Sequence, residues 1–412
     1  MTEADFPPVD AEETAIGRLL FYDPILSGNR NISCGTCHHH DHASGDGLAL
    51  GVGEGGKGVG EERSTGAGAH RIEQRVPRNA PALFNLGARQ VTTLFHDGRL
   101  TIAETYANGF DSPAEEALPD GLASILAAQA LFPITSETEM AGSPGENDIS
   151  FAAGSDITRA WAEIAKRVRT IPAYGTRLAA VNGFDDAAEV TIVEIANALG
   201  AFVASEWRSF DSPYDRFLAG EASLPADAMR GLDLFFGAAG CGTCHSGPLL
   251  TDQRFHALAL PHFGPGRTRP FDPYVRDVGR MAETDRLEDA YRFRTPSLRN
   301  VALTAPYGHN GAYATLEGIV RHHLDPVAAF DAWTETEVAL PAADWLAIED
   351  FVALEDRRER ARLRAAVDIA PVALTDGEVA DLVAFLNALT GAESVKGRLG
   401  RPETVPSGLP VD

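Results

Sequence analysis

All four cysteines of this 412-residue chain fall in two short Cys-x-x-Cys-His segments. The residues that these segments supply are Cys34, Cys37 and His38 in the first and Cys241, Cys244 and His245 in the second. Such a segment attaches a c-type haem, because its two thiols bond to the macrocycle and the adjacent imidazole binds the iron. A thioredoxin-like pair does not need a histidine after its second cysteine, and a zinc site would require the two distant pairs to meet. The sequence therefore predicts two covalently bound haems c and leaves no cysteine for a disulfide.

Charge and hydropathy limit the expected partners and location. The formal net charge is −24, and haem propionates would add to it, so we expect no nucleic-acid partner. An acidic surface could steer a small basic redox protein, or it could simply keep the protein in solution. No apolar run is long enough to span a membrane, and residues 1–5 lack the basic and apolar parts of a signal peptide. Because haem is attached covalently outside the cytoplasmic membrane, we expect a periplasmic protein whose leader has been removed.

The surroundings of the two haem segments predict two modules in tandem. Each segment follows an apolar and aromatic stretch, at residues 17–22 in the first module and 231–236 in the second. We expect a mainly α-helical fold of two cytochrome-c-like haem domains with long loops. The N-terminal domain is predicted at 15–205 and the C-terminal domain at 225–392, with a crossing between them that contains Ser-Pro and glycine.

Local patterns predict helices that end the modules and one glycine-rich loop. Apolar residues recur at helical spacing over 192–202. Thr375 and Glu378 form a capping box that opens an amphipathic run, which Gly391 closes. Ten glycines lie within residues 45–68, which favours a mobile loop that either gates the first haem or has no role beyond linking.

Several further motifs follow one another in a characteristic order. In the first module they are Leu-Phe-Tyr-Asp-Pro-Ile-Leu-Ser at 20–27, Arg-Asn-Ala-Pro-Ala-Leu-Phe-Asn at 78–85, His-Asp-Gly-Arg at 96–99 and Glu-Met at 139–140. In the second module they are Phe-Arg-Thr-Pro-Ser-Leu-Arg-Asn-Val at 293–301 and Leu-Thr-Ala-Pro-Tyr-Gly-His-Asn-Gly at 303–311. In this order the chain resembles the bacterial dihaem cytochrome c peroxidase superfamily, which includes the MauG-type enzymes that oxidise protein side chains. The resemblance implies that one haem reacts with hydrogen peroxide and the other relays electrons.

For the first haem, the resemblance implies His38 as the proximal ligand and Glu139 as the acid/base that moves a proton between the peroxide oxygens. A glutamate in a loop is otherwise an ordinary solvated charge. His70 stands near the place of a loop histidine that caps this iron in many resting relatives, and it could equally be a surface residue. Tyr106 stands seven residues after Arg99, where the family often has a glutamine. The expected distal pocket is therefore altered, with a phenol that could donate to peroxide or be oxidised.

For the second haem, the resemblance implies His245 as the proximal ligand and His323 as the sixth ligand, fourteen residues after His309. Peroxidases of the family have methionine there and MauG-type enzymes have tyrosine. A bis-histidine haem is expected to have a lower reduction potential than a histidine–methionine haem. The alternative is that His323 is a polar helix residue, and its neighbour His322 could be mistaken for the ligand. His96 replaces a tryptophan that lies between the haems in the family, so electrons are expected to cross by direct tunnelling or through another aromatic group.

The resemblance also implies a calcium ion between the haem domains. Its ligands would be the side chain of Asn79 and the carbonyl oxygens of Thr304 and Pro306, which otherwise are simply turn residues. Calcium accepts oxygen ligands together with several waters, so few protein ligands suffice. The remaining histidines are expected to be surface or hydrogen-bonded residues, with a weak metal-binding signal in the cluster at 38–42.

Three functions follow from these expectations. The first is a peroxidase that reduces hydrogen peroxide with electrons from a small redox protein, such as a cytochrome c or a cupredoxin. The second is a MauG-type enzyme that uses the same oxidising equivalents on a side chain of a partner protein. The third is a dihaem electron carrier without chemistry of its own, which Glu139 and the lack of a permanent sixth ligand for the first haem disfavour. The peroxidase is preferred, with the protein-modifying enzyme close behind.

Overall fold

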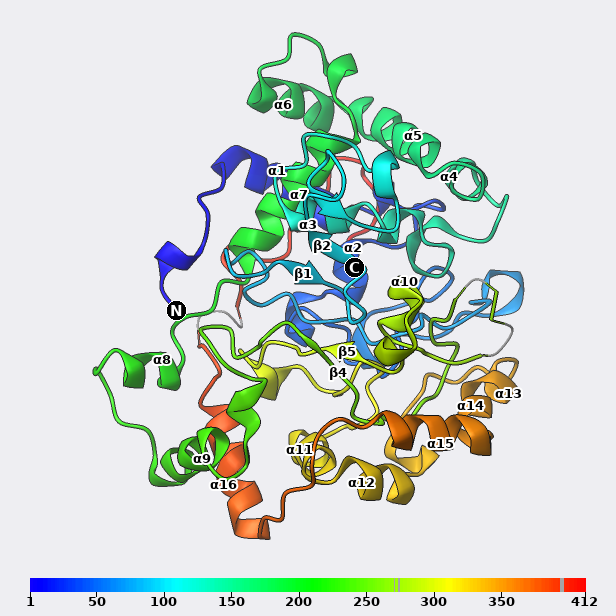
Figure 1. Ribbon diagram of the computed structural model, residues 1–412. Helices are drawn as coiled ribbons and strands as arrows, with labels where there is room; N and C mark the ends of the chain where they lie inside the picture. The colour runs from blue at the N-terminus through cyan, green and yellow to red at the C-terminus, as the bar shows by residue number, and fades with distance from the viewer. Residues whose placement is uncertain (270, 273–274, 393–395) are drawn as a thin grey trace.

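The computed structural model describes residues 1–269, 271–272, 275–392 and 396–412 of the chain. The described part is mainly helical, which confirms the predicted fold class (Figure 1). The helices of the first half are α1 (Ala11–Phe21), α2 (Cys34–Cys37), α3 (Ile125–Ala130), α4 (Asp148–Ala153), α5 (Ile157–Arg169), α6 (Pro172–Asn182) and α7 (Ile192–Glu206). Those of the second half are α8 (Pro213–Leu218), α9 (Ala226–Phe236), α10 (Met281–Thr284), α11 (Leu316–Leu324), α12 (Pro326–Ala332), α13 (Ala347–Asp350), α14 (Val352–Glu355), α15 (Arg357–Ala366) and α16 (Asp376–Asn387). None of the helices in these residues combines the length and the apolar character needed to cross a membrane.

Two small antiparallel sheets lie in the middle of the molecule, between the helices of the two halves (Figure 1). The first sheet has the order β1 (Thr93–Leu94), β2 (Leu100–Ile102) and β3 (Phe110–Asp111), with Leu94 opposite Leu100. The second pairs β4 (Phe255–His256) with β5 (Phe293–Arg294). A backbone hydrogen bond of 2.7 Å from Arg294 to the carbonyl of His96 joins the two halves at this level.

In each half, two closely packed helices support the Cys-x-x-Cys-His segment. A Cβ added at Gly17 in α1 would lie 1.8 Å from the carbonyl oxygen of Ala198 in α7, and one at Gly231 in α9 would lie 1.9 Å from that of Asp381 in α16. Only glycine allows such an approach without moving backbone. In each half, the helix before the haem segment is therefore fixed against the long helix near the end of that half.

An aromatic residue at the end of each of these helices covers the attachment turn. Ring atoms of Tyr22 lie 2.3 Å from the position of a Cβ on Gly35, and a ring atom of Phe236 lies 2.5 Å from that on Gly242. Each glycine stands between the two cysteines of its segment. Tyr22 and Phe236 therefore occupy equivalent positions in the two halves.

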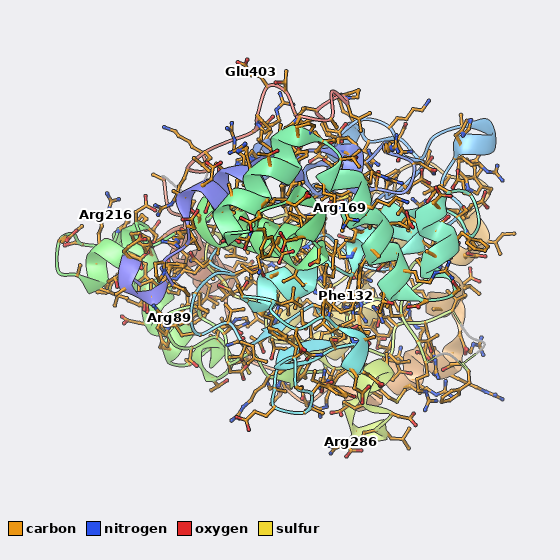
Figure 2. The ribbon with its side chains drawn as sticks, turned by 90° about the horizontal axis from the view of Figure 1, so that it is seen from above. Arg89, Phe132, Arg169, Arg216, Arg286 and Glu403 are labelled. Carbon is orange, nitrogen blue, oxygen red and sulfur yellow. The ribbon has the colours of Figure 1, made fainter. Side chains whose placement is uncertain are left out.

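Each half has a large hydrophobic core, two smaller clusters contain residues of both halves, and the C-terminal tail belongs to the first core. Val405 of the tail is buried in the first core, and Ser407 donates a 2.6 Å hydrogen bond to Asp23. Arg18 of α1 donates to the carbonyl of Gly400 at 2.7 Å. Seen from above, the tail carrying Glu403 follows the edge of the first half (Figure 2). The sequence did not predict this return of the chain.

The glycine-rich segment at 45–68 is folded around a buried arginine. The guanidinium of Arg63 donates to the carbonyls of Val52, Gly58 and Gly53. These three hydrogen bonds give the segment a defined course, so the prediction of a mobile loop is not supported. The glycines serve close packing instead: a Cβ on Gly53 would lie 1.8 Å from the carbonyl oxygen of Thr138.

Candidate functional site

A cavity of about 920 Å³ runs through the centre of the molecule and reaches both haem segments. Its walls include the residues Cys34, Cys37, His38, Cys241, Cys244, His245 and His323. None of the four cysteines forms a disulfide, so all four can bond to haem. The cavity is predominantly apolar, which suits a macrocycle with a few polar groups that fix its orientation.

The histidine of each Cys-x-x-Cys-His segment is oriented in the same way. The Nδ1–H of His38 donates to the carbonyl of Ser44 at 3.0 Å, and that of His245 donates to the carbonyl of Leu250 at 3.1 Å. Ser44 and Leu250 both have the left-handed backbone conformation, which turns their carbonyls back toward the ring. In each case Nε2 remains available for a metal, the arrangement in which a backbone carbonyl fixes the tautomer of a histidine ligand. Burial lowers the pKa of His245 to about 4, with a further contribution from His323, so the ring is neutral at pH 7.

His323 faces His245 across the second part of the cavity. The centres of the two imidazole rings lie 6.5 Å apart. Two nitrogen ligands at about 2 Å on opposite faces of one metal ion keep their ring centres roughly 6 Å apart. Nδ1 of His323 donates to the carbonyl of Ile319 at 2.8 Å, one turn earlier in α11, which leaves Nε2 for the metal.

The first part of the cavity differs, because among the described residues no imidazole ring faces His38 at a similar distance. Glu139 lies on the cavity wall instead, in the π-helical turn η8 (Glu137–Ala141). Burial lowers the pKa of His38, and the charge of Glu139 opposes this shift, so the carboxylate lies within electrostatic reach of His38. The backbone of Glu139 is held by a 3.0 Å hydrogen bond from the amide of Glu54 in the glycine-rich segment.

Gln129, near the end of α3, lines the same cavity and was missed by sequence reasoning. Tyr106 does not line it, because residues 103–109 form the end of the hairpin between β2 and β3 on the outside of the molecule. The interpretation of Tyr106 as the distal residue is therefore corrected, because a count of seven residues from Arg99 ends in this hairpin and not on the cavity wall.

His70 also lies outside the cavity. Its side chain is exposed, in the short 3-10 helix η5 (Gly68–His70), and it is absent from the cavity wall. The structure therefore does not bring His70 to the first haem position, and the expectation that it caps the iron has no support in this conformation.

One buried polar atom supports the presence of a bound group with a polar edge. Asp46 is 1 % exposed and lines the cavity, and its Oδ2 atom has no hydrogen-bond partner within the described part of the protein. Burial raises the pKa of this carboxyl group to about 7. A haem fits this observation, together with the two pairs of cysteines that form no disulfide and the available imidazole nitrogens of His38 and His245.

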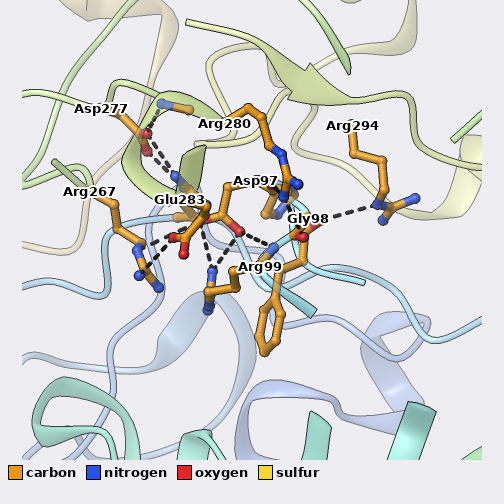
Figure 3. A network of polar contacts seen from close by, with 12 residues as sticks. Asp97, Gly98, Arg99, Arg267, Asp277, Arg280, Glu283 and Arg294 are labelled. Carbon is orange, nitrogen blue, oxygen red and sulfur yellow. Dashed lines mark hydrogen bonds and ion pairs between the residues drawn. The ribbon is translucent and has the colours of Figure 1, made fainter. Parts of the chain in front are cut away.

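Asp97 is the centre of a charged network where the two halves meet (Figure 3). It accepts hydrogen bonds from Arg78 at 2.6 Å and Arg99 at 3.1 Å, and it lies 3.7 Å from Arg267 of the second half. Burial alone would raise the pKa of Asp97, but the three guanidinium groups lower it well below its usual range. Arg78 also pairs with Asp277, so the network ties the two halves together beside the cavity.

The comparison with known proteins decides the family. The model of the di-haem cytochrome c peroxidase family matches residues 11–223, which is more than half of the chain. The chain belongs to the di-haem cytochrome c peroxidase family. Membership of this family implies two haems c as the cofactors of the chain.

Relatives in this family include both peroxidases and MauG. The methylamine utilization protein MauG of Methylorubrum extorquens is 29% identical over 321 residues, which cover 77% of this chain and 70% of the relative. The cytochrome c551 peroxidase of Nitrosomonas europaea is 29% identical over 315 residues, covering 76% of this chain and 73% of the relative. The subtype is therefore not decided by sequence identity.

Similar solved structures also include both a MauG-like protein and a peroxidase. A MauG-like protein associated with microbial copper homeostasis has a TM-score of 0.63 at 29% identity, covering 96% of this chain and 93% of that one. The diheme peroxidase BthA of Burkholderia thailandensis has a TM-score of 0.62 at 25% identity, covering 95% and 88%. Both agree with the fold of this family member.

The three residues expected to bind calcium lie on the wall of the cavity. Asn79, Thr304 and Pro306 all line the cavity, and the amide of Asn79 donates to the carbonyl of His309 at 2.9 Å, across the two halves. The side-chain amide nitrogen of Asn79 donates to the carbonyl of Leu48 at 2.6 Å, so its oxygen remains an acceptor. Such neutral oxygen atoms are ligands that calcium accepts.

His96 lies on the cavity wall between the two haem segments, where the resemblance implies a tryptophan in other members. Its Nε2–H donates to the carbonyl of Asn79 at 3.1 Å. Burial and the nearby Arg78 lower the pKa of His96 to about 4, so it is a neutral ring. Phe293 and His309, both of the second half, stack nearby with ring centres 3.6 Å apart and also line the cavity.

Proposed function

We propose that this enzyme reduces hydrogen peroxide at the haem attached to the first segment and receives electrons through the haem attached to the second. The observation that carries the proposal is the asymmetry of the cavity. His245 has an imidazole facing it at 6.5 Å, whereas Glu139 and Gln129 line the wall of the first part. One position suits a haem closed by two side chains, and the other suits a haem that small oxidants reach.

In the first part of the cavity, each side chain has a distinct task. The bound haem iron supplies the centre at which peroxide is reduced. Glu139 takes a proton from one peroxide oxygen and returns it to the other, the transfer expected of a general acid/base. Gln129 orients peroxide through its amide, which both donates and accepts hydrogen bonds. The π-helical turn and the contact with Gly53 hold the backbone of Glu139 in place.

In the second part, His245 and His323 are proposed as the two iron ligands. His322 is excluded from this role by its own hydrogen bonds: Nδ1 is bonded to Tyr313 at 2.8 Å and Nε2 to the carbonyl of Leu258 at 2.7 Å. A calcium ion held by Asn79 and the carbonyls of Thr304 and Pro306 is part of the proposal, as a link between the two halves.

The proposed electron donor is a small redox protein, a cytochrome c or a cupredoxin, and the proposed location is the periplasm, where covalent haem attachment takes place. The acidic surface favours a basic donor, because opposite charge accelerates encounter.

A second candidate function is oxidation of a side chain in a partner protein. It is favoured by the relation to MauG, which is as similar to this chain as the Nitrosomonas peroxidase is. Titration of the dihaem enzyme with hydrogen peroxide, with and without reduced cytochrome c, separates the candidates. Rapid oxidation of cytochrome c supports the peroxidase, whereas a long-lived oxidised spectrum that cytochrome c does not discharge supports a protein substrate. Absence of any reaction with peroxide would overturn both.

A further inference from the structure

A tyrosine, a histidine and a glutamate form a continuous hydrogen-bonded chain beside the first attachment turn. The phenol of Tyr22 is bonded to Nδ1 of His40, and Nε2 of His40 lies 2.8 Å from Oε1 of Glu206. Tyr22 and Glu206 are both 0 % exposed. Because a carboxylate only accepts hydrogen bonds, Nε2 of His40 carries the proton, and Nδ1 accepts the phenolic hydrogen.

Glu206 is held as a carboxylate by the C-terminal tail. The backbone amides of Leu399 and Gly400 donate to it at 2.8 Å and 2.7 Å. Burial alone would raise the pKa of Glu206, but the hydrogen bonds from His40 and from these amides lower it below its usual value. A Cβ on Gly397 would lie 2.3 Å from Oε1 of Glu206, so the tail closes tightly over the group.

The phenol ring is close to the first haem position. Ring atoms of Tyr22 are packed on Gly35, which stands between the two cysteines that bond to the macrocycle. Phe21 lines the cavity, and its ring centre lies 5.3 Å from that of Tyr22. An electron leaving Tyr22 therefore has a short path to the haem edge through packed atoms.

We propose that Tyr22 is a redox-active residue that gives one electron to the first haem site while its phenolic proton moves to Nδ1 of His40. This inference rests on the proposed peroxide reaction. Hydrogen peroxide requires two electrons and two protons to become two molecules of water, and solvent supplies the two protons. Tyr22 supplies one of the electrons. The other comes from the external donor by way of the second haem during turnover, and from the haem pair when the donor is absent.

The proton balance is internal to the chain of three residues. The O–H bond of Tyr22 breaks as an N–H bond forms at Nδ1 of His40, which leaves a neutral tyrosyl radical beside an imidazolium–carboxylate pair. The buried carboxylate of Glu206 stabilises the imidazolium, since an opposite charge in contact favours the charged form. When the donor later reduces the radical, the proton returns from His40 to Tyr22.

Other buried tyrosines lack this combination. Tyr174 donates directly to the carboxylate of Asp23 at 2.6 Å, and an aspartate binds a proton less tightly than an imidazole does. Tyr313 is bonded to His322, but the other nitrogen of that ring faces a neutral carbonyl rather than a carboxylate. In the second half the equivalent of Tyr22 is Phe236, which has no hydroxyl group.

The test is freeze-quench EPR spectroscopy of the dihaem enzyme mixed with hydrogen peroxide in the absence of donor. We expect an organic radical signal whose splitting changes when the protein is labelled with ring-deuterated tyrosine. The signal is expected to be lost in Tyr22→Phe and in His40→Gln, because an amide cannot take up the proton. It is expected to persist in Tyr174→Phe and Tyr313→Phe, the matched controls for buried, hydrogen-bonded tyrosines.

The outcomes separate the inference from the proposed function. Tyr22→Phe is expected to fold and to bind both haems, because it removes only the hydroxyl group and keeps the ring that packs on Gly35. An enzyme that consumes peroxide but gives an unchanged radical signal in Tyr22→Phe overturns the inference alone, and so does a signal that disappears in Trp207→Phe instead. An enzyme that consumes no peroxide overturns the proposed function and this inference with it.

Discussion

His322 and His323 are neighbours on α11, yet their rings have different surroundings. Both ring nitrogens of His322 are hydrogen-bonded within the protein, to Tyr313 and to the carbonyl of Leu258. His323 uses only Nδ1, in a bond to the carbonyl of Ile319, and its ring faces His245. The two adjacent histidines thus have separate tasks: one joins α11 to the surrounding chain, and the other faces the second haem position.

Replacing His323 is therefore expected to open the second haem. In His323→Ala, the low-spin absorbance and EPR signals of that haem should become high-spin, because one of its two strong ligands is gone. Added imidazole should restore the low-spin spectrum. His322→Gln is the matched control and should leave the spectrum low-spin, while a low-spin second haem in His323→Ala without imidazole would exclude His323 as the ligand.

Replacing Glu139 tests the proton transfer at the first haem. Glu139→Gln removes the carboxylate but keeps its shape, so both haems should remain bound. We expect peroxide consumption to slow at least about tenfold, since general acid/base catalysis contributes roughly 10²–10⁴-fold. Stopped-flow measurement of peroxide loss gives the rate. Glu137→Gln, an exposed glutamate in the same turn, is the control, and equal rates for the two variants would remove Glu139 from the mechanism.

The haem attachment, the helical fold and the position of Glu139 on the cavity wall could be predicted from the sequence, because short motifs carry them. The motif Cys-x-x-Cys-His contains its own chemistry, and the glutamate lies in a local turn. Gln129 belongs to no motif, and the count of seven residues from Arg99 ends at Tyr106, in the hairpin between β2 and β3. A count along the sequence does not show how the intervening backbone folds.

Contacts between residues far apart in the chain could not be predicted from the sequence. Glycines at 45–68 indicate flexibility when read as composition, but Arg63 gathers their carbonyls and Gly53 packs on Thr138. The bond between His40 and Glu206 joins residues far apart in the chain and is closed by the tail. No local sequence pattern predicts these contacts.

Replacing Gln129 and replacing Tyr106 are expected to have different effects on the rate of peroxide consumption. Gln129→Ala should lower the rate of peroxide consumption by roughly tenfold, the equivalent of one hydrogen bond of about 1.4 kcal/mol. Tyr106→Phe should leave the rate unchanged, because the phenol lies on the outer hairpin and away from the cavity. The same stopped-flow assay measures both. A loss of rate in Tyr106→Phe with none in Gln129→Ala would show that Tyr106, and not Gln129, is the distal residue.

The last prediction concerns Asp97, which joins the two halves through Arg78, Arg99 and Arg267. Asp97→Asn removes a buried charge from its partners, and breaking such a pair costs about 3–5 kcal/mol. We expect a lower urea midpoint for the transition in which the halves separate, followed by haem absorbance and tryptophan fluorescence. Asp111→Asn, an exposed aspartate on the neighbouring strand β3, should leave the midpoint unchanged.

The pH dependence of this stability follows from the lowered pKa of Asp97. In the unfolded chain an aspartate titrates near 3.9, so above about pH 4 the ionised form contributes its full stabilisation to the folded protein. As the pH falls below this value, the unfolded chain takes up a proton that the folded protein does not, and the contribution declines toward the lower folded pKa. The wild-type midpoint should therefore fall between pH 5 and pH 3 more steeply than that of Asp97→Asn, since the variant lacks the titrating group. Equal slopes in the two proteins would mean that Asp97 does not carry the acid sensitivity of the contact between the halves.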